Sequence, residues 1–193
     1  MLHDWGSRDL DFINTNTRIR ERLLAIANAS RTHVCVPLQG SGTFIVEAAL
    51  CTLIPTDGKA LILVNGEYGK RMAKILDYAS RSYLIQETPE DQTPSIDKLD
   101  EALAADADIS HVLAVHCETT SGILNPIEEI SNVVKSRDRS LFIDAMSAFG
   151  AINLNADHIY FDALVASSNK CLEGVPGVGF ALIREQELEA CEK

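Results

Sequence analysis

The chain has 193 residues, of which 46% are hydrophobic, enough for the core of one α/β domain or two small ones. Its 17 basic and 28 acidic residues give a formal net charge of −11, which argues against a nucleic-acid partner because phosphate backbones require a basic surface. No apolar run approaches the roughly 20 residues of a membrane span. The polar, acidic residues 1–11 do not resemble a secretory signal.

Cysteine usage favours the cytoplasm. The five cysteines are scattered and share no ligand spacing with the five histidines. The sequence therefore predicts buried, reduced thiols in a cytoplasmic protein and no metal site.

Strand-like and helix-like segments alternate along the chain. A helical period covers residues 9–28, with Ile13, Ile19 and Leu23 among its apolar positions. Further helices are expected at residues 44–53, 70–79, 95–105 and 126–135, and from Arg184 to Lys193. Strands are expected at residues 32–38, 59–64, 81–86, 111–116, 140–143, 163–166 and 178–183. This order predicts an α/β fold with a mostly parallel seven-stranded sheet, helices on both faces, and residues 178–183 as one antiparallel strand.

A glycine-rich turn, Gln39-Gly-Ser-Gly-Thr, joins the first strand to the second helix. Its hydroxyls at Ser41 and Thr43, together with the free N–H groups of the helix start, could bind a phosphate. A plain strand-to-helix turn is an equal alternative, and the spacing matches neither the dinucleotide fingerprint nor a P-loop.

Two further strand ends carry candidate ligand-binding residues. Tyr68 lies in a predicted loop, residues 65–69, where it could stack on a planar ring or cap the core. Asp144 follows an apolar strand and needs a cation or a strong donor, which a protonated ring nitrogen would supply; the alternative is a helix N-cap. A cluster of hydroxyls, residues 117–122, leaves a third strand at the same edge.

Lys170 follows the strand at residues 163–166, after Ser167 and Asn169 and before Gly174. A lysine at the exit of a buried strand is expected to be partly desolvated, which lowers its pKa and frees the amine as a nucleophile. Such an amine can form a Schiff base with a carbonyl compound or with pyridoxal phosphate. The alternative is a surface lysine in a turn.

Five motifs together resemble one enzyme family. They are Gln39-Gly-Ser-Gly-Thr, Asn65-Gly-Glu-Tyr-Gly-Lys-Arg, His116-Cys-Glu-Thr-Thr-Ser-Gly, Phe142-Ile-Asp-Ala-Met-Ser and Ser167-Ser-Asn-Lys-Cys-Leu-Glu-Gly-Val-Pro-Gly. As a set they resemble the class V group of fold type I aminotransferases, which depend on pyridoxal 5'-phosphate. Within this group they are most similar to enzymes that move the amino group of 2-aminoethylphosphonate to pyruvate, giving phosphonoacetaldehyde and alanine.

The resemblance implies a role for each matching residue. Lys170 would bind the cofactor covalently and carry the proton in catalysis, and Asp144 would pair with the pyridinium nitrogen. Tyr68 would stack on the ring, and Thr119 or Thr120 would donate to its O3′ oxygen. The phosphate would be bound by Ser41, Gly42, Thr43, Ser167 and Asn169.

The resemblance also implies that residues 1–193 form the large cofactor-binding domain of a homodimeric enzyme. The family's N-terminal Pro-Gly-Pro segment and its C-terminal small domain have no counterpart in these residues. Three alternatives stay open: a class V aminotransferase of the alanine–glyoxylate or serine–pyruvate type, a cysteine desulfurase relative, and an inactive truncated domain that only binds cofactor or dimerises. A nucleotide-binding domain is disfavoured, since G-x-G-x-x-G is missing.

Overall fold

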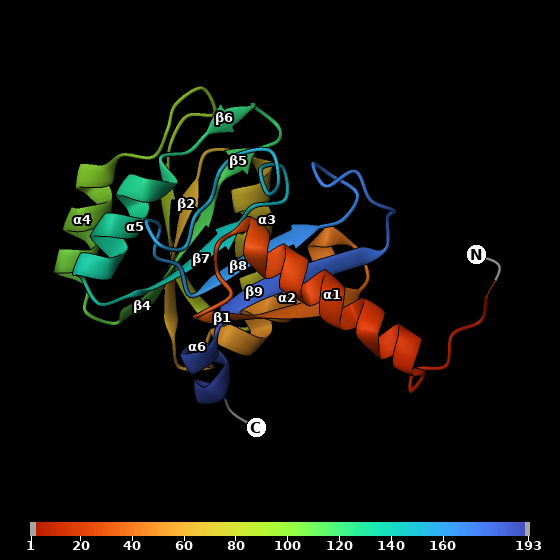
Figure 1. Ribbon diagram of the computed structural model, residues 1–193. Coiled ribbons are helices and arrows are strands. Elements are labelled where there is room, and N and C mark those ends of the chain that lie inside the picture. The colour runs from red at the N-terminus through yellow and green to blue at the C-terminus, as the bar shows by residue number, and fades with distance from the viewer. Residues whose placement is uncertain (1–2, 192–193) are drawn as a thin grey trace.

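The computed structural model describes residues 3–191, which form a seven-stranded sheet, a two-stranded hairpin and six helices (Figure 1). The helices are α1 (Leu10–Ile26), α2 (Gly42–Leu53), α3 (Glu67–Tyr78), α4 (Ile96–Ala105), α5 (Ile127–Ser136) and α6 (Glu185–Ala190). The sheet strands are β1 (His33–Gln39), β2 (Lys59–Val64), β3 (Ser82–Glu87), β4 (Ile109–Val115), β7 (Ser140–Asp144), β8 (Ala163–Ser167) and β9 (Val178–Arg184). The hairpin pairs β5 (Cys117–Glu118) with β6 (Ile123–Leu124).

The sheet has the predicted architecture. Its strand order is β1-β9-β8-β7-β4-β2-β3. Neighbours from β8 to β3 are parallel, whereas β9 is antiparallel to both β8 and β1. The predicted mostly parallel sheet with one antiparallel strand is therefore confirmed, and the carboxyl ends of β1, β2, β4, β7 and β8 lie at one edge.

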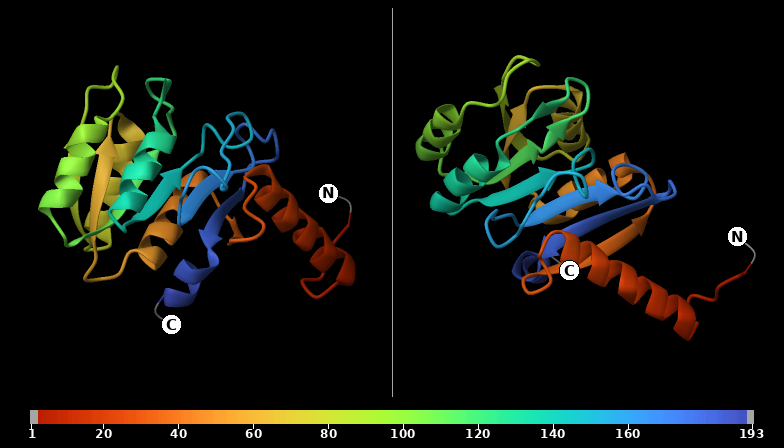
Figure 2. Two further views of the ribbon diagram at one scale, coloured as in Figure 1. Left: turned by 60° about the vertical axis from the view of Figure 1, so that its left-hand side comes forward. Right: turned by 45° about the horizontal axis from the view of Figure 1, so that its top comes forward.

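Helices cover both faces of the sheet, as Figure 2 shows. One face packs against α1, α4 and α5 through a core that includes Leu23, Leu103 and Ile130. The other packs against α2 and α3 through residues such as Leu50 and Met72. Both faces of the central strands are thus removed from water, which explains why β2, β7 and β8 read as continuous apolar runs.

Helix α1 departs from the sequence prediction. Its C-terminal end packs beside β1, but the rest extends away from the body of the molecule (Figures 1 and 2). Of its predicted apolar positions Leu23 is buried, whereas Ile13 and Ile19 are 45% and 42% exposed. The helical period was read correctly, but within the helix only Leu23 and Leu24, near its C-terminal end, pack against the core of the described chain.

Many predicted element boundaries differ from the structure by one to three residues, and two of these differences concern helix starts. Residues 65–69 were expected to form a loop, but α3 already begins at Glu67. Pro126 was expected at the first helical position, but it is the N-cap of α5, which begins at Ile127. In contrast, the predicted N-cap at Ser95 is confirmed, since its hydroxyl accepts a hydrogen bond from the Lys98 amide.

The predicted burial of the thiols was only partly correct. Cys35 is buried, but Cys51 and Cys171 are exposed, and all five cysteines are free. The helix expected from Arg184 to Lys193 is α6, Glu185–Ala190; its predicted end lies outside the described residues. Within residues 3–191, no helix combines the length and the apolar character needed to cross a membrane.

Candidate active site

The carboxyl edge of the sheet carries a pocket that brings together most of the residues singled out in the sequence. It lies between the loop after β1, the start of α3, the end of β7 and the loop after β8. Its lining residues are Ser41, Gly42, Thr43, Val46, Tyr68, Arg71, Asp144, Met146, Ser167, Asn169 and Lys170. Four segments far apart in the sequence therefore contribute to a single site.

The start of α2 forms one side of the pocket. Ser41 is the N-cap of this helix, and its Oγ accepts a hydrogen bond from the Phe44 amide at 3.2 Å. A methyl group on Gly42 would lie 2.9 Å from the Met146 sulfur and 3.7 Å from Ser167 Oγ. The glycine thus keeps the helix start open toward β8, and the amides and hydroxyls gathered there are suited to an anion.

Asp144 lies at the end of β7 and is only 2% exposed. Its Oδ1 accepts a hydrogen bond from the Met146 amide at 3.0 Å, the one hydrogen bond that residues 3–191 make to this carboxylate. Burial raises the pKa of Asp144 to about 6 and the Glu118 charge adds to the rise, while the Met146 amide and the charges of Arg71 and Lys170 oppose it. A buried carboxylate with a single donor is chemically suited to a cationic N–H partner in the pocket.

Lys170 lines the same pocket as Asp144, but its side chain is exposed. The expectation that its ammonium is partly desolvated was therefore wrong for this chain. The reason lies in its surroundings, because residues 169–178 of the loop that follows β8 are themselves exposed, apart from the half-buried Leu172. The amine is thus accessible from the pocket and from solvent.

Arg71 is a pocket residue that the sequence analysis missed. Its guanidinium lies 4.6 Å from the centre of the Tyr68 ring and donates a hydrogen bond to Thr43 Oγ1 at 3.1 Å. Tyr68 and Arg71 are three residues apart, so they share one face of α3. Had the helix been predicted to begin at Glu67, this spacing would have placed Arg71 beside Tyr68.

Thr119 and Thr120 lie outside the pocket lining. The Thr119 hydroxyl is 2.6 Å from Ser147 Oγ, and the Thr120 hydroxyl donates to Glu118 Oε1 at 2.8 Å. The Thr120 hydroxyl would have to leave Glu118 to donate to a ligand, whereas the Thr119 hydroxyl can donate to one while it accepts from Ser147. Within residues 3–191, no cluster of three or more His, Cys, Asp and Glu side chains is arranged to hold a metal ion.

Sequence comparison identifies close relatives. The chain is 53% identical over 190 residues to the 2-aminoethylphosphonate–pyruvate transaminase of Pseudomonas fluorescens, an alignment that covers 98% of this chain and 52% of the relative. It is 52% identical to the enzyme of the same name from Pseudomonas aeruginosa, covering 98% of this chain and 51% of that protein. The chain spans about half the length of these curated relatives.

Solved structures share the fold. Pyridoxamine–pyruvate aminotransferase from Mesorhizobium loti matches with a TM-score of 0.89 and 26% identity, covering 98% of this chain and 48% of its own. Alanine–glyoxylate aminotransferase from Nostoc sp. matches with a TM-score of 0.91 at 21% identity, over 97% of this chain and 49% of its own.

The family assignment follows from sequence and structure together. The model of the family described as "Aminotransferase class-V" matches residues 6–193, nearly the whole chain. The match contains all four segments that line the pocket. The chain therefore belongs to the class V aminotransferases.

Proposed function

We propose that this chain is the cofactor-binding domain of an enzyme that uses pyridoxal phosphate to move the amino group of 2-aminoethylphosphonate to pyruvate. The observation that carries the proposal is the convergence of Lys170 and Asp144 on one pocket beside the open start of α2. An amine, a buried carboxylate and an anion-binding helix start are the groups that this cofactor needs. The names of the close relatives supply the two substrates.

Pyridoxal phosphate supplies, when bound, an aldehyde that accepts amino groups and a ring that withdraws electrons from the adjacent carbon. The Lys170 Nζ would bind the cofactor and, once free, take the proton from the carbon that bears the amino group. Asp144 would keep the ring nitrogen protonated. This role agrees with its burial and with its one amide donor, because a cationic N–H would lower a pKa that burial has raised.

The remaining pocket residues would orient the cofactor. Ser41, Gly42 and Thr43 lie at the start of α2, where free amides and the helix dipole favour a phosphate, with Ser167 and Asn169 beside them. Tyr68 would cover one face of the ring. The Thr119 hydroxyl would donate to O3′ while accepting from Ser147, or the Thr120 hydroxyl would do so after leaving Glu118.

The anionic substrate group has a candidate partner in Arg71. A guanidinium binds phosphonate or phosphate oxygens with parallel hydrogen bonds, and Arg71 already reaches the pocket wall at Thr43. A site for a phosphonate donor needs such a cation, since the phosphonate otherwise enters a pocket that also contains the Asp144 carboxylate.

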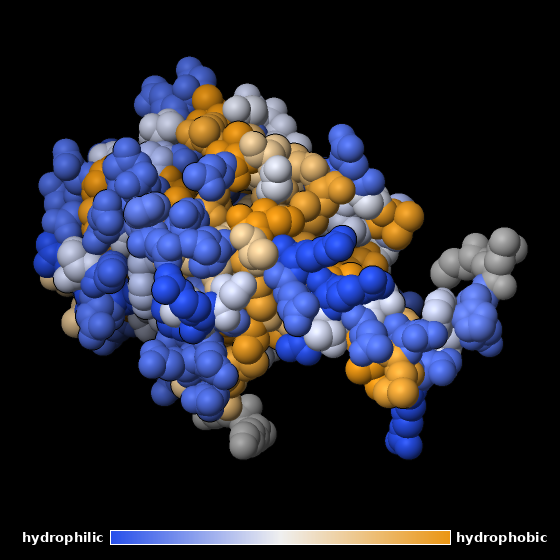
Figure 3. Space-filling model, viewed as in Figure 1, coloured by the Kyte–Doolittle hydropathy of each residue, from blue (hydrophilic) through white to orange (hydrophobic). Residues whose placement is uncertain are grey.

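We further propose that the enzyme is a cytoplasmic homodimer in which α1 contacts a second copy of the chain. Helix α1 exposes Leu10, Ile13, Ile19 and Ile26, and hydrophobic residues gather at the end of the helix that lies furthest from the sheet (Figure 3). Leu10 and Ile13, three residues apart, share one face at this end, and an exposed apolar patch of this kind is typical of a protein interface. The free thiols agree with a reducing compartment.

A coupled assay for alanine tests the proposed reaction. The enzyme that contains this domain, supplied with pyridoxal phosphate and pyruvate, is given either 2-aminoethylphosphonate or serine as the amino donor. We expect alanine to form with the phosphonate donor. Alanine formed with serine but not with the phosphonate donor would favour a serine–pyruvate enzyme. Cofactor binding without alanine from either donor would favour a domain that only binds cofactor.

A further inference from the structure

Glu118 is a buried carboxylate outside the pocket lining, and its contacts connect it to the pocket. The side chain is completely buried, where an ionised group is stable only with several donors. Its Oε2 accepts the Tyr68 amide hydrogen at 3.2 Å, and its Oε1 accepts the amide and hydroxyl hydrogens of Thr120 at 3.2 and 2.8 Å. The carboxylate thus joins the hairpin after β4 to the first turn of α3.

This arrangement replaces the ordinary cap of a helix. The N-cap of α3 is Gly66, which has no side chain to accept the first amides of the helix. A methyl group on Gly66 would lie 2.3 Å from Glu118 Cγ and 2.4 Å from its Cδ. Gly66 is therefore required by the space that Glu118 occupies, and the distant carboxylate caps the helix in its place.

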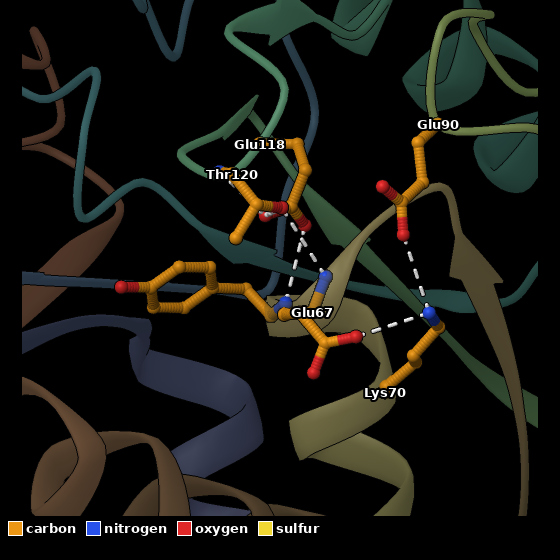
Figure 4. A network of polar contacts seen from close by, with 6 residues as sticks. Glu67, Lys70, Glu90, Glu118 and Thr120 are labelled. Carbon is orange, nitrogen blue, oxygen red and sulfur yellow. Dashed lines mark hydrogen bonds and ion pairs between the residues drawn. The ribbon is translucent and has the colours of Figure 1, made fainter.

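Thr120 extends the cap to the neighbouring amide. Its hydroxyl donates to Glu118 and accepts the Glu67 amide hydrogen at 3.4 Å, so two consecutive amides of α3 are bound from the hairpin. Figure 4 shows Glu118 and Thr120 together on one side of the helix start, whereas the Glu67 side chain points toward Lys70. The two glutamates near this turn therefore have different partners.

The chain before Gly66 cannot retreat from Glu118. Asn65 is buried and donates to Asn125 Oδ1 at 2.8 Å and to the Gln92 carbonyl at 2.9 Å. Asn125 in turn donates to the Val115 carbonyl at 2.8 Å, at the end of β4. This buried amide pair fixes the end of β2 to the end of β4, so the positions of Gly66 and Glu118 are fixed relative to each other.

We propose that Glu118 is a positioning residue for the cofactor ring, because it fixes the backbone of Tyr68 and thereby the aromatic ring that lines the pocket. The inference rests on the proposed function in that it takes Tyr68 as the residue that covers the ring. In this role Glu118 contacts neither the cofactor nor the substrate. Its hydrogen bonds act on binding through α3. Its charge also helps to raise the pKa of Asp144, so Glu118→Gln is compared with Gly66→Ala, which keeps that charge.

Three variants separate this role from general stability. Glu118→Gln keeps the shape but replaces one acceptor oxygen by an amino group that cannot accept a hydrogen. Gly66→Ala displaces an unchanged Glu118. Glu67→Gln is the matched control, because it changes a carboxylate in the same turn that binds only Lys70.

The first measurement needs no cofactor. Hydrogen exchange of the Tyr68 amide, followed by NMR, is expected to accelerate about 10-fold or more in Glu118→Gln and in Gly66→Ala, and to stay unchanged in Glu67→Gln. If the substitutions at the buried positions prevent folding, Thr120→Val serves instead, because Thr120 is exposed. This variant should accelerate exchange at the Glu67 amide. Unchanged exchange in the variants that fold would overturn the inference, whatever the chain binds.

The second measurement uses pyridoxal phosphate as the probe. We expect Glu118→Gln to raise its Kd about 10-fold and to weaken the visible circular dichroism of the bound ring, with neither effect in Glu67→Gln. In a Tyr68→Ala background, Glu118→Gln should have little further effect on Kd, because both changes remove the same contact. Additive effects, or a wild-type Kd in Glu118→Gln, would contradict the inference. Failure of the wild-type chain to bind the cofactor would instead contradict the proposed function.

Discussion

Replacing Asp144 by asparagine is expected to stabilise the cofactor-free chain at neutral and alkaline pH. Burial raises the pKa of Asp144 from 3.8 to about 6, so between these values the folded chain holds a proton that the unfolded chain has released. The free energy of unfolding therefore falls as the pH rises through this window, by at most about 3 kcal/mol. About 1.5 kcal/mol of that fall lies between pH 5 and pH 8.

Asparagine has the shape of aspartate and keeps an oxygen for the Met146 amide, but it does not ionise. Urea unfolding of Asp144→Asn and of the wild-type chain at pH 5 and pH 8 gives the difference between their free energies of unfolding. We expect this difference to move by about 1.5 kcal/mol in favour of the variant at the higher pH. A difference that does not change with pH would refute the reasoning, because Asp144 would then have the same pKa in both states. Added pyridoxal phosphate should stabilise the wild-type chain more than the variant.

Three further substitutions test other parts of the account. Gly42→Ala places a methyl group 2.9 Å from the Met146 sulfur, and we expect it to raise the Kd for pyridoxal phosphate about 10-fold. Gly6→Ala is the control, and an unchanged Kd in Gly42→Ala would argue against an anion site at α2. Ile13→Glu, at a position 45% exposed, should convert a dimer to a monomer in analytical ultracentrifugation with an unchanged far-UV circular dichroism spectrum; a monomeric wild-type chain would contradict the proposed dimer. Asp162→Ala removes the ion-pair partner of the partly buried Arg184, 3.3 Å away, and the acceptor of the Leu141 amide and the Tyr160 hydroxyl. It should lower the free energy of unfolding in urea by about 3 kcal/mol or more; a loss below about 1 kcal/mol would show that this buried carboxylate matters little.

The sequence predicted the sheet well because buried strands have a clear local signature. Residues 59–64 were predicted as a strand and form β2 with the same bounds. Parallel strands covered on both sides are continuous apolar runs, and each is followed by polar residues where the chain leaves the core. Asp144 could be identified for the same reason, since a carboxylate after such a run needs a partner.

The start of α3 could not be predicted from nearby residues. Its cap is Glu118, some 50 residues further along the chain. Without that contact, Asn65-Gly-Glu-Tyr-Gly looks like a loop, because glycines usually mark turns. The missed helix start also concealed Arg71, whose place in the pocket depends on sharing a helix face with Tyr68.

The exposure of α1 and of Lys170 has a different cause. A helical period identifies an apolar face, but it does not tell whether that face packs against its own chain or against a partner. Lys170 was expected to be desolvated because it follows a buried strand, yet burial of a side chain depends on what covers it. In residues 3–191 the loop after β8 is itself largely exposed and does not bury this lysine.

The covalent capture of the cofactor tests the central claim most directly. The chain is incubated with pyridoxal phosphate, reduced with borohydride, digested, and analysed by mass spectrometry. We expect the wild-type chain to give one modified peptide, with the cofactor on Lys170. The corresponding peptide of Lys170→Ala should carry no cofactor. Cofactor spread over surface lysines, or an equal yield from Lys170→Ala, would contradict the assignment of this pocket.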